Sequence, residues 1–293
     1  MSVTIIINPI AGRARGSGGQ ARVDVARTVA ASLDVDAEIV VTERPGHARD
    51  LAQAAVARGV AAVVAWGGDG TINEVASVLA FGAVPLGIVP AGSGNGLARE
   101  LGIDLPPARA IAAALRADAR AIDVGEVEDR LFISTAGVGV DAYVASRFNA
   151  PSSRRRGFLG YAGITARALA SYAPVHYRIT TAGAVADVRA VLVTVANSAQ
   201  FGNGARIAPG ARVDDGLLDL VVLQERSRLT TLVHLPRLFT GSVARVPGCR
   251  LQKVTEVTIE ADEPMTFHVD GESCEGGTRL HARVHPGALK VLV

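Results

Sequence analysis

Residues 1–125 alternate between short β-branched runs and longer Ala-rich stretches. Short β-branched runs are typical of strands, whereas Ala-rich stretches of several turns favour helices. We therefore predict strands at residues 4–8, 37–42, 60–66 and 85–90, and helices at residues 20–33, 47–58, 72–81, 95–101 and 107–116. This regular alternation predicts an α/β domain, with a parallel sheet covered by helices.

The pattern changes after residue 123, where short β-rich runs separated by Gly, Pro and Asp become dominant. Regularly spaced short strands with turn residues between them predict an antiparallel sandwich or barrel. Helical segments are expected within this part at residues 157–172 and 229–239. We place the two domains at residues 1–125 and 126–293, and leave open whether the last strand returns to the first domain.

The overall composition narrows the class of protein. With 49% hydrophobic residues, 20% charged residues and a net charge of +2, the chain has the composition of an ordinary soluble globular protein. Aromatic residues make up only 4%, so the side chains that stack on bases are few. The net charge of +2 is also too small to indicate a nucleic-acid partner. No apolar run approaches the ~20 residues of a membrane span, and no basic region marks a signal peptide. We therefore expect a cytoplasmic protein.

The spacing of the cysteine and histidine residues does not indicate a metal site. Cys249 and Cys274 match no metal-ligand spacing, and in a reducing cytoplasm two free thiols are favoured over a disulfide. The six histidines show no metal-ligand spacing either, and His268 is expected to be a strand residue without a catalytic role.

Three glycine-rich turns follow predicted strands of the first domain: INPIAGRARG, WGGDGTINE and PAGSGNGLARE. All three should lie at the carboxyl ends of parallel strands, where open α/β sheets bind ligands. Glycine lets the backbone approach a ligand closely, and a helix N-terminus offers N–H groups to phosphate. After the middle turn, Thr71 and Glu74 match a capping box, which predicts a helix beginning at Ile72.

The rarity of lysine excludes the commonest phosphate site. Lys253 and Lys290 are the only lysines and both lie late in the chain, so no P-loop is present. The G-x-G-x-x-G dinucleotide fingerprint is also missing. Phosphate charge must then be neutralised by backbone N–H groups, arginines and a divalent metal held by carboxylates. Asp69 is an acid inside a turn expected to bind phosphate, which is compatible with a cation bound between the carboxylate and the phosphate.

Together with TAGVGVDAYV, GARIAPGARVDDGLLDLVVL and HVDGE, these turns occur in the order found in the diacylglycerol kinase catalytic-domain family. The chain resembles this family, which includes bacterial lipid kinases, sphingosine kinases and ceramide kinases, over essentially its whole length. GGDGT alone is shared with NAD kinases and 6-phosphofructokinases, whereas the later elements are specific. The resemblance implies an N-terminal α/β domain of the NAD kinase/diacylglycerol kinase type followed by a C-terminal antiparallel β-sandwich.

The resemblance also implies ATP-dependent phosphorylation of a lipid hydroxyl and a set of site residues. Those assigned to the nucleotide are Asn8, Gly12, Thr42, Gly67, Gly68, Asp69, Gly70, Thr71, Asn73, Gly92 and Ser93. A structural Mg²⁺ would be held by Asp215 and the carbonyls of Arg212 and Leu217, although spacing alone favours a plain turn there.

For catalysis, the resemblance assigns proton acceptance from the lipid hydroxyl to Asp270 of the DGE element, with Glu272 beside it and Asp69 coupling nucleotide, metal and base. Other members are thought to use the GGDGT acid as the base, so this division between Asp270 and Asp69 stays open. A D-G pair that ends a strand is otherwise typical of a hairpin turn.

The acceptor lipid is not identified by the sequence. Many bacterial diacylglycerol kinases have Asp after the Asn of the third turn, whereas this chain has Gly96, as in the sphingosine kinase variant. The arginine cluster Arg154–Arg156 precedes an amphipathic segment, and either contacts anionic headgroups or is a solvated charge run.

We therefore expect an ATP- and Mg²⁺-dependent lipid kinase, cytoplasmic or peripheral at the inner membrane face, whose partner is a lipid alcohol at the membrane surface and not nucleic acid. The alternatives are an NAD kinase-like or other small-alcohol kinase and a non-catalytic nucleotide-binding regulator. The oligomeric state stays open, with a homodimer among the candidates.

Overall fold

The computed structural model describes residues 2–12, 18–149, 168, 172–202, 205–227, 230, 233–238 and 240–293. These residues form two compact units, Met1–Ile122 with Gly287–Val293, and Asp123–Pro286. The cluster Arg154–Arg156 and nearly all of the helix predicted at 157–172 lie outside the described residues, as does part of the segment 229–239. Among the described residues, no helix is long and apolar enough to cross a membrane.

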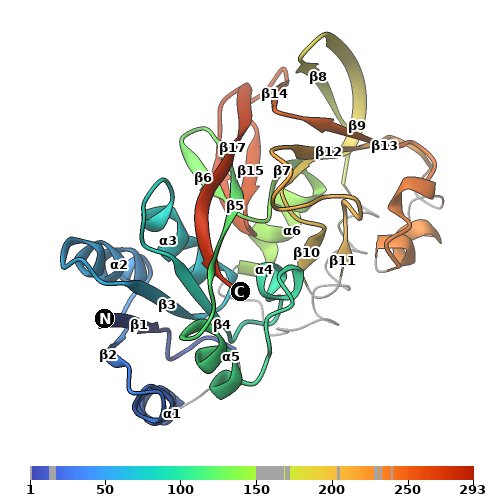
Figure 1. Cartoon of the computed structure of the whole chain (residues 1–293). Coiled ribbons are helices and arrows are strands. Elements are labelled where there is room, and N and C mark those ends of the chain that lie inside the picture. The colour runs from blue at the N-terminus through green and yellow to red at the C-terminus, as the bar shows by residue number, and fades with distance from the viewer. Residues whose placement is uncertain are drawn as a thin grey trace. The chain divides into compact units, whose positions relative to one another are not determined.

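The first unit is built on a parallel sheet in the order β2-β1-β3-β4, with the last residues of β17 paired to β4 (Figure 1). Its strands are β1 (Ser2–Ile7), β2 (Asp36–Val41), β3 (Ala62–Gly67) and β4 (Leu86–Pro90), while β17 (Arg279–Leu292) contributes residues to both units. Its helices are α1 (Gly18–Ser32), α2 (His47–Ala57), α3 (Asp69–Leu79), α4 (Gly96–Glu100) and α5 (Pro107–Ala114). The predicted α/β architecture is confirmed.

Helices cover both faces of this sheet, which explains its uninterrupted apolar strands. Helices α1 and α5 pack on one face and α2 and α3 on the other (Figure 1). Every residue of β3 is buried, as are all residues of β1 except Ser2. A parallel strand buried on both faces has no solvent side, so it shows a continuous apolar run in place of alternation.

Helix α3 begins earlier than the capping-box pattern predicts. It starts at Asp69, with Gly68 as N-cap, so Thr71 lies inside the first turn instead of capping it. Glu74 caps a different helix, because its carboxylate accepts hydrogen bonds from the backbone N–H groups of Gly46 (3.0 Å) and Ala48 (3.1 Å) at the start of α2. Helix α2 has no side-chain cap of its own, so the acid on α3 supplies it.

Removing the Glu74 carboxylate should therefore destabilise α2 and its packing on α3. We expect Glu74→Ala to lower the free energy of unfolding by about 1–2 kcal/mol, the usual cost of losing a helix cap. Chemical denaturation of the whole chain measures this loss. Glu43→Ala is the matched control, since Glu43 is exposed just before the same helix. An equal effect in both variants would contradict the capping role.

The second unit is an antiparallel β-sandwich in which β9 is the central strand. The main order is β16-β15-β7-β9-β8-β14-β17, and β12 pairs with both β9 and β13. The strands are β5 (Ala119–Val127, which begins in the first unit), β6 (Arg130–Phe132), β7 (Thr135–Gly139), β8 (Val175–Thr181), β9 (Ala184–Ala196), β10 (Gln200–Gly202), β11 (Ala205–Arg206), β12 (Leu218–Gln224), β13 (Cys249–Val254), β14 (Glu256–Glu260), β15 (Thr266–Val269) and β16 (Glu272–Glu275). Helix α6 (Val140–Asn149) and the 3₁₀ turns η1 (Leu235–Leu238) and η2 (Val243–Arg245) complete it.

The sandwich core is apolar and closely packed. Phe132, Phe267 and Tyr177 are its largest fully enclosed side chains, and burial raises the pKa of the Tyr177 hydroxyl. Both cysteines are free thiols, as expected, and burial raises the pKa of Cys249 to about 11. The predicted C-terminal sandwich is confirmed.

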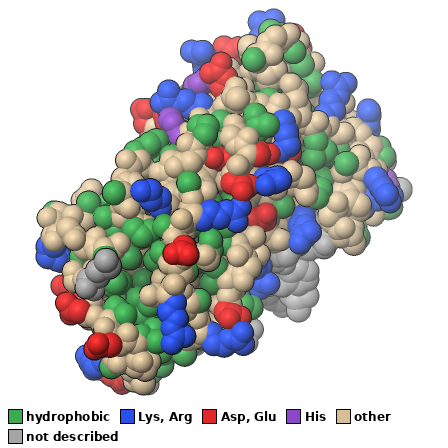
Figure 2. All heavy atoms as spheres, in the orientation of Figure 1, with side chains coloured by type: hydrophobic (Ala, Val, Ile, Leu, Met, Phe, Trp, Pro, Cys, Tyr) green, Lys and Arg blue, Asp and Glu red, His purple; other side chains and the backbone are tan. Residues whose placement is uncertain are grey.

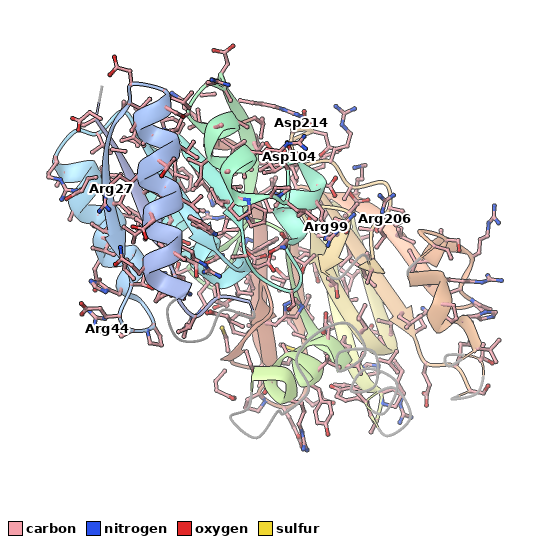
Figure 3. All side chains as sticks on the ribbon, turned by 90° about the horizontal axis from the view of Figure 1, so that it is seen from below. Arg27, Arg44, Arg99, Asp104, Arg206 and Asp214 are labelled. Carbon is pink, nitrogen blue, oxygen red and sulfur yellow. The ribbon has the colours of Figure 1, made fainter. Side chains whose placement is uncertain are left out.

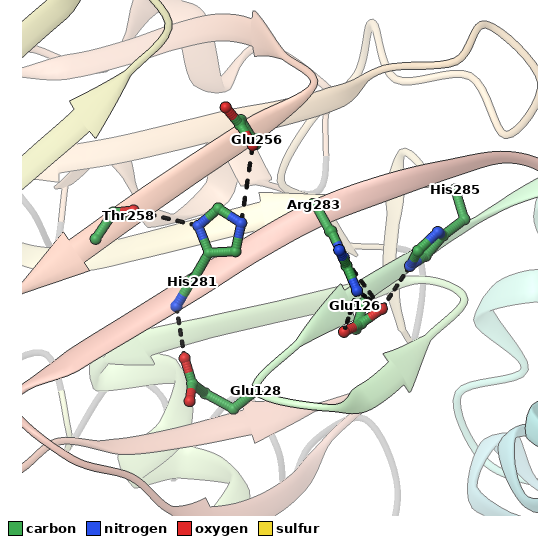
Figure 4. Close-up of polar contacts among 7 residues, drawn as sticks. All are labelled: Glu126, Glu128, Glu256, Thr258, His281, Arg283 and His285. Carbon is green, nitrogen blue, oxygen red and sulfur yellow. Dashed lines mark hydrogen bonds and ion pairs between the residues drawn. The ribbon is translucent and has the colours of Figure 1, made fainter.

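A polar cluster lies along one face of β17, where alternate side chains meet those of β5 and β14 (Figure 4). Arg283 donates three hydrogen bonds to the Glu126 carboxylate at 3.0–3.3 Å, and His285 lies against the same carboxylate. Burial acts to raise the pKa of Glu126, but the hydrogen bonds from His285 and Arg283 and their charges outweigh it, so the pKa is lowered.

The lowered pKa of Glu126 predicts an acid-dependent loss of stability. A folded-state pKa below the unfolded value gives stability that is present above the unfolded pKa of about 4.3 and is lost as pH falls through the folded pKa. We expect the melting temperature of the wild type to fall more steeply below about pH 5 than that of Glu126→Gln. Glu263→Gln, at an exposed position of the same unit, should follow the wild type. Parallel curves for the wild type and Glu126→Gln would refute the linkage.

Candidate active site

The three glycine turns meet at one edge of the first unit's sheet, because β1, β3 and β4 are adjacent parallel strands whose carboxyl ends point the same way. The amide of Asn8 donates to the Thr71 hydroxyl at 2.9 Å and so joins the first turn to the second. The backbone N–H of Ala91 donates to the Gly67 carbonyl at 2.8 Å and joins the second to the third. The predicted residues Asn8, Gly67 and Thr71 are thus brought together.

Two glycines are required by this close approach. Gly12 has a φ of +73°, and a Cβ there would lie 2.3 Å from the carbonyl oxygen of Ala91. A Cβ on Gly92 would lie 2.9 Å from the Cα of Gly68. Any side chain at either position would push the turns apart, so both glycines bring the backbones of neighbouring turns into contact.

Asp69 stabilises the third turn. Its Oδ2 accepts the backbone N–H of Asn95 at 3.0 Å, and its Oδ1 accepts that of Gly96 at 2.8 Å. Asn95 has a left-handed backbone, and its side-chain oxygen accepts the N–H of Gly92 at 2.8 Å. The acid inside GGDGT therefore connects the second turn to the third. Its proposed metal-linked role stays a prediction.

The remaining predicted nucleotide residues follow β2 or lie on α3 and the third turn. Thr42 follows β2, and its N–H donates to the Ile7 carbonyl at 2.8 Å, beside the first turn. Gly70 and Asn73 lie on α3, and Ser93 is exposed on the third turn. Arg99 projects from α4 (Figure 3), and its Nε donates to the Gly94 carbonyl at 3.1 Å, which further supports that turn.

Arg22 was missed by the sequence analysis. It lies on α1, donates to the carbonyls of Asn8 and Ala11 (2.7 Å for Ala11), and places its guanidinium 5.6 Å from the centre of the Trp66 ring. Burial lowers the pKa of Arg22. Because its guanidinium donates to two carbonyls of the first turn, Arg22 places a cation beside that turn. Arginine in a helix has no motif around it that could have identified this contact.

In the second unit, Asp270 is anchored by backbone N–H groups. Its Oδ1 accepts those of Ser134 (2.8 Å) and Thr135 (3.0 Å), and its Oδ2 accepts that of Ile133 (2.9 Å). Asp270 and Gly271 both have positive φ and join β15 to β16, so the D-G pair does form a hairpin turn. The same residue therefore forms the turn and holds its carboxylate in a fixed position. Glu272, which is exposed, follows at the start of β16.

His268 is more than a plain strand residue, because it connects this hairpin to a buried acid. Its Nε2 lies 3.1 Å from Asp141 Oδ2, and the N–H of Gly271 approaches its Nδ1 at 3.4 Å. Asp141 also accepts the hydroxyl of Thr194 at 2.5 Å. The ring thus lies between the Asp141 carboxylate on its Nε2 side and the Gly271 N–H on its Nδ1 side. His268 and Asp141 are 1% and 4% exposed, so their hydrogen bonds offset the cost of burial.

The loop predicted to hold a structural metal precedes β12. Asp215 Oδ1 accepts the N–H of Leu217 at 3.2 Å, and its Oδ2 accepts Lys253 Nζ at 2.7 Å. One carboxylate and the carbonyls of Arg212 and Leu217 are hard oxygen ligands of the kind that Mg²⁺ prefers. The ammonium of Lys253 already lies against that carboxylate. Within the described parts of the chain, no three His, Cys, Asp or Glu side chains gather in a metal-binding group, so this ligand set stays a prediction.

A nucleotide-type α/β unit with three converging glycine turns, followed by a β-sandwich, defines a kinase-like class of protein. Residues 2–127 match the model of the diacylglycerol kinase catalytic domain, and residues 134–293 match that of the YegS C-terminal NAD kinase beta sandwich-like domain. The chain belongs to the diacylglycerol kinase catalytic-domain family.

Individual relatives agree with this assignment. The chain is 35% identical over 275 residues to the "Probable lipid kinase YegS-like" protein of Pseudomonas aeruginosa PAO1, covering 92% of this chain and 89% of the relative. It is 32% identical over 307 residues to the diacylglycerol kinase of Mycobacterium tuberculosis H37Rv, covering 99% and 94%. A diacylglycerol kinase crystal structure from Bacillus anthracis has the same fold, with a TM-score of 0.78, 23% identity and coverage of 99% and 96%. The expectation of a lipid kinase family enzyme is confirmed.

Proposed function

We propose that this protein transfers the γ-phosphoryl group of ATP to the hydroxyl of a lipid alcohol. The observation that carries the proposal is the convergence of three glycine turns on one sheet edge, in a member of this family. Backbone N–H groups and the N-terminus of the 11-residue helix α3 supply the positive potential that triphosphate needs. With no P-loop lysine in the chain, these groups and Arg22 take over its part in neutralising phosphate.

Residues on the first unit are proposed to bind and orient the nucleotide. Asn8, Gly12 and Gly92 shape the turns, Thr42, Thr71, Asn73 and Ser93 offer polar side chains, and Gly67, Gly68 and Gly70 allow close backbone approach. Asp69 is proposed to hold Mg²⁺ bound with ATP, which offsets phosphate charge and polarises the transferred group. Asp69 also fixes the third turn, so nucleotide and turn geometry are coupled through one carboxylate.

On the second unit, Asp270 is proposed to accept the proton of the attacking hydroxyl, with Glu272 beside it. A carboxylate that receives the proton as the O–P bond forms removes the positive charge that would develop on the attacking oxygen. Three backbone N–H donors fix the carboxylate of Asp270, and a catalytic group held in this way needs no reorganisation during the reaction.

The acceptor and the site of action form the remaining part of the proposal. We propose a cytoplasmic protein that meets its lipid at the membrane surface. On the face drawn in Figure 2, Lys and Arg side chains are interspersed with Asp and Glu, which offers no support for nucleic acid as a partner.

A panel of acceptors tests the proposal. Purified protein is incubated with γ-labelled ATP and Mg²⁺ and with diacylglycerol, sphingosine, ceramide or phosphatidylglycerol in detergent micelles, and with NAD as the soluble alternative. We expect labelled product from at least one lipid and none from NAD. Preferential labelling of NAD would favour the NAD kinase-like alternative, and nucleotide binding without any transfer would favour a non-catalytic regulator.

A further inference from the structure

Lys253 lies between two carboxylates of the second unit. Its Nζ is 2.7 Å from Asp215 Oδ2 and 3.0 Å from Asp219 Oδ2. Strand pairing explains the second contact, because Lys253 on β13 lies directly opposite Asp219 on β12. The first contact reaches beyond the strand to the loop that leads into β12. One ammonium thus joins the loop to the sheet.

The acidity of this segment makes a cation necessary. Asp214, Asp215 and Asp219 lie within six consecutive positions, and the Asp219 side chain is only 7% exposed. Arg212 Nε lies 3.3 Å from Asp214 Oδ1, whereas Lys253 contacts the other two acids. A buried carboxylate beside a second one is costly unless a positive charge lies between them.

The choice of lysine at this position is itself informative. The chain has 30 basic residues, of which only Lys253 and Lys290 are lysines, so arginine is the ordinary cation of this sequence. An ammonium is a compact point charge with three N–H donors, whereas a guanidinium is a planar fork suited to one bidentate partner. A compact cation is suited to contact carboxylate oxygens from two different elements at once. A metal ion is compact in the same way.

We propose that the ammonium of Lys253 takes the place of a divalent cation at this loop, so that residues 212–219 fold without bound metal. The proposal concerns only the loop before β12 and is independent of the Mg²⁺ that accompanies ATP. It also provides a physical reason why the oxygen ligands of Arg212, Asp215 and Leu217 need no metal, since Lys253 already balances the charge of Asp215.

Thermal unfolding without nucleotide tests the proposal. We expect the wild type to melt at the same temperature in EDTA and in millimolar Mg²⁺, and Lys253→Met to melt several degrees lower in EDTA. Lys290→Met removes the only other lysine, which is exposed on β17, and should match the wild type. If Lys253→Met melts like Lys290→Met, or if Mg²⁺ raises the melting temperature of the wild type but not of Asp215→Asn, the proposal is wrong.

Direct metal binding gives a second test that does not require Lys253→Met to fold. Mn²⁺ bound to the nucleotide-free protein is counted by electron paramagnetic resonance in the wild type and in Asp215→Asn. Equal numbers of bound Mn²⁺ support the proposal, because the loop then contributes no site. One additional Mn²⁺ in the wild type would show that the loop holds a metal and would overturn it.

Discussion

Replacing Asp270 with Asn is expected to abolish phosphoryl transfer to lipid while ATP binding persists. The amide cannot accept the hydroxyl proton, so we expect the transfer rate to fall by at least about 100-fold, the usual contribution of a general base. ATP affinity should stay within about twofold of the wild type, because the proposed nucleotide residues belong to the other unit. Initial rates with γ-labelled ATP and titration calorimetry with MgATP measure the two quantities.

The hydrogen bonds of Asp270 make a structural control necessary. An amide nitrogen in place of one carboxylate oxygen would face the backbone N–H groups of residues 133–135, so some loss of stability is expected. Melting temperatures separate that loss from catalysis when rates are compared well below unfolding. Asp262→Asn, an exposed acid just before β15, should keep full activity. Near-normal transfer by Asp270→Asn would remove this residue from the role of base.

Asp69→Asn is expected to weaken nucleotide binding by about tenfold or more. The carboxylate accepts one N–H on each oxygen, from Asn95 and Gly96, whereas an amide offers only one acceptor. The other N–H is left facing an NH₂ group, and leaving a half-buried donor unsatisfied costs about 1–3 kcal/mol. The third turn loosens, and with it the predicted contacts of Gly92 and Ser93. Titration calorimetry with ATP measures the change.

Magnesium separates the two roles given to Asp69. If Asp69 only fixes the turn, the variant should lose affinity equally with MgATP and with ATP in EDTA. If it also holds the metal, as we propose, the loss should be larger with Mg²⁺ present. Asp36→Asn, at an exposed position of the same unit, is the matched control and should bind like the wild type. Unchanged affinity of Asp69→Asn for MgATP would contradict both roles.

The architecture could be predicted because it depends on local patterns. Strands such as β3 are marked by continuous apolar runs, and the change after residue 123 to short strands separated by turn residues marks the sandwich. The start of α3 could not be predicted in this way. Thr71 and Glu74 have the spacing of a capping box, but Glu74 instead accepts hydrogen bonds from the N-terminus of α2, 26–28 residues away in sequence. A local sequence motif does not show that one of its side chains bonds to a distant part of the fold.

The candidate site was predictable where glycine marks it and not where long-range contacts build it. Asp69 and Asp270 stand in recognisable motifs, but the N–H groups that hold Asp270 lie 135–137 residues away in sequence. His268 and Asp141 are 127 residues apart, and Lys253 lies 38 residues from Asp215. Such pairs leave no periodic signal in one sequence, since their proximity arises only when the strands pair.

The most direct test of the central claim is where the γ-phosphoryl group goes. The protein is incubated with γ-labelled ATP, Mg²⁺ and a total bacterial lipid extract, and the label is measured after partition between organic and aqueous phases. We expect the wild type to put label on a lipid in the organic phase, and Asp270→Asn to leave that lipid unlabelled. Label confined to the aqueous phase, as free phosphate or on a soluble alcohol such as NAD, would contradict it.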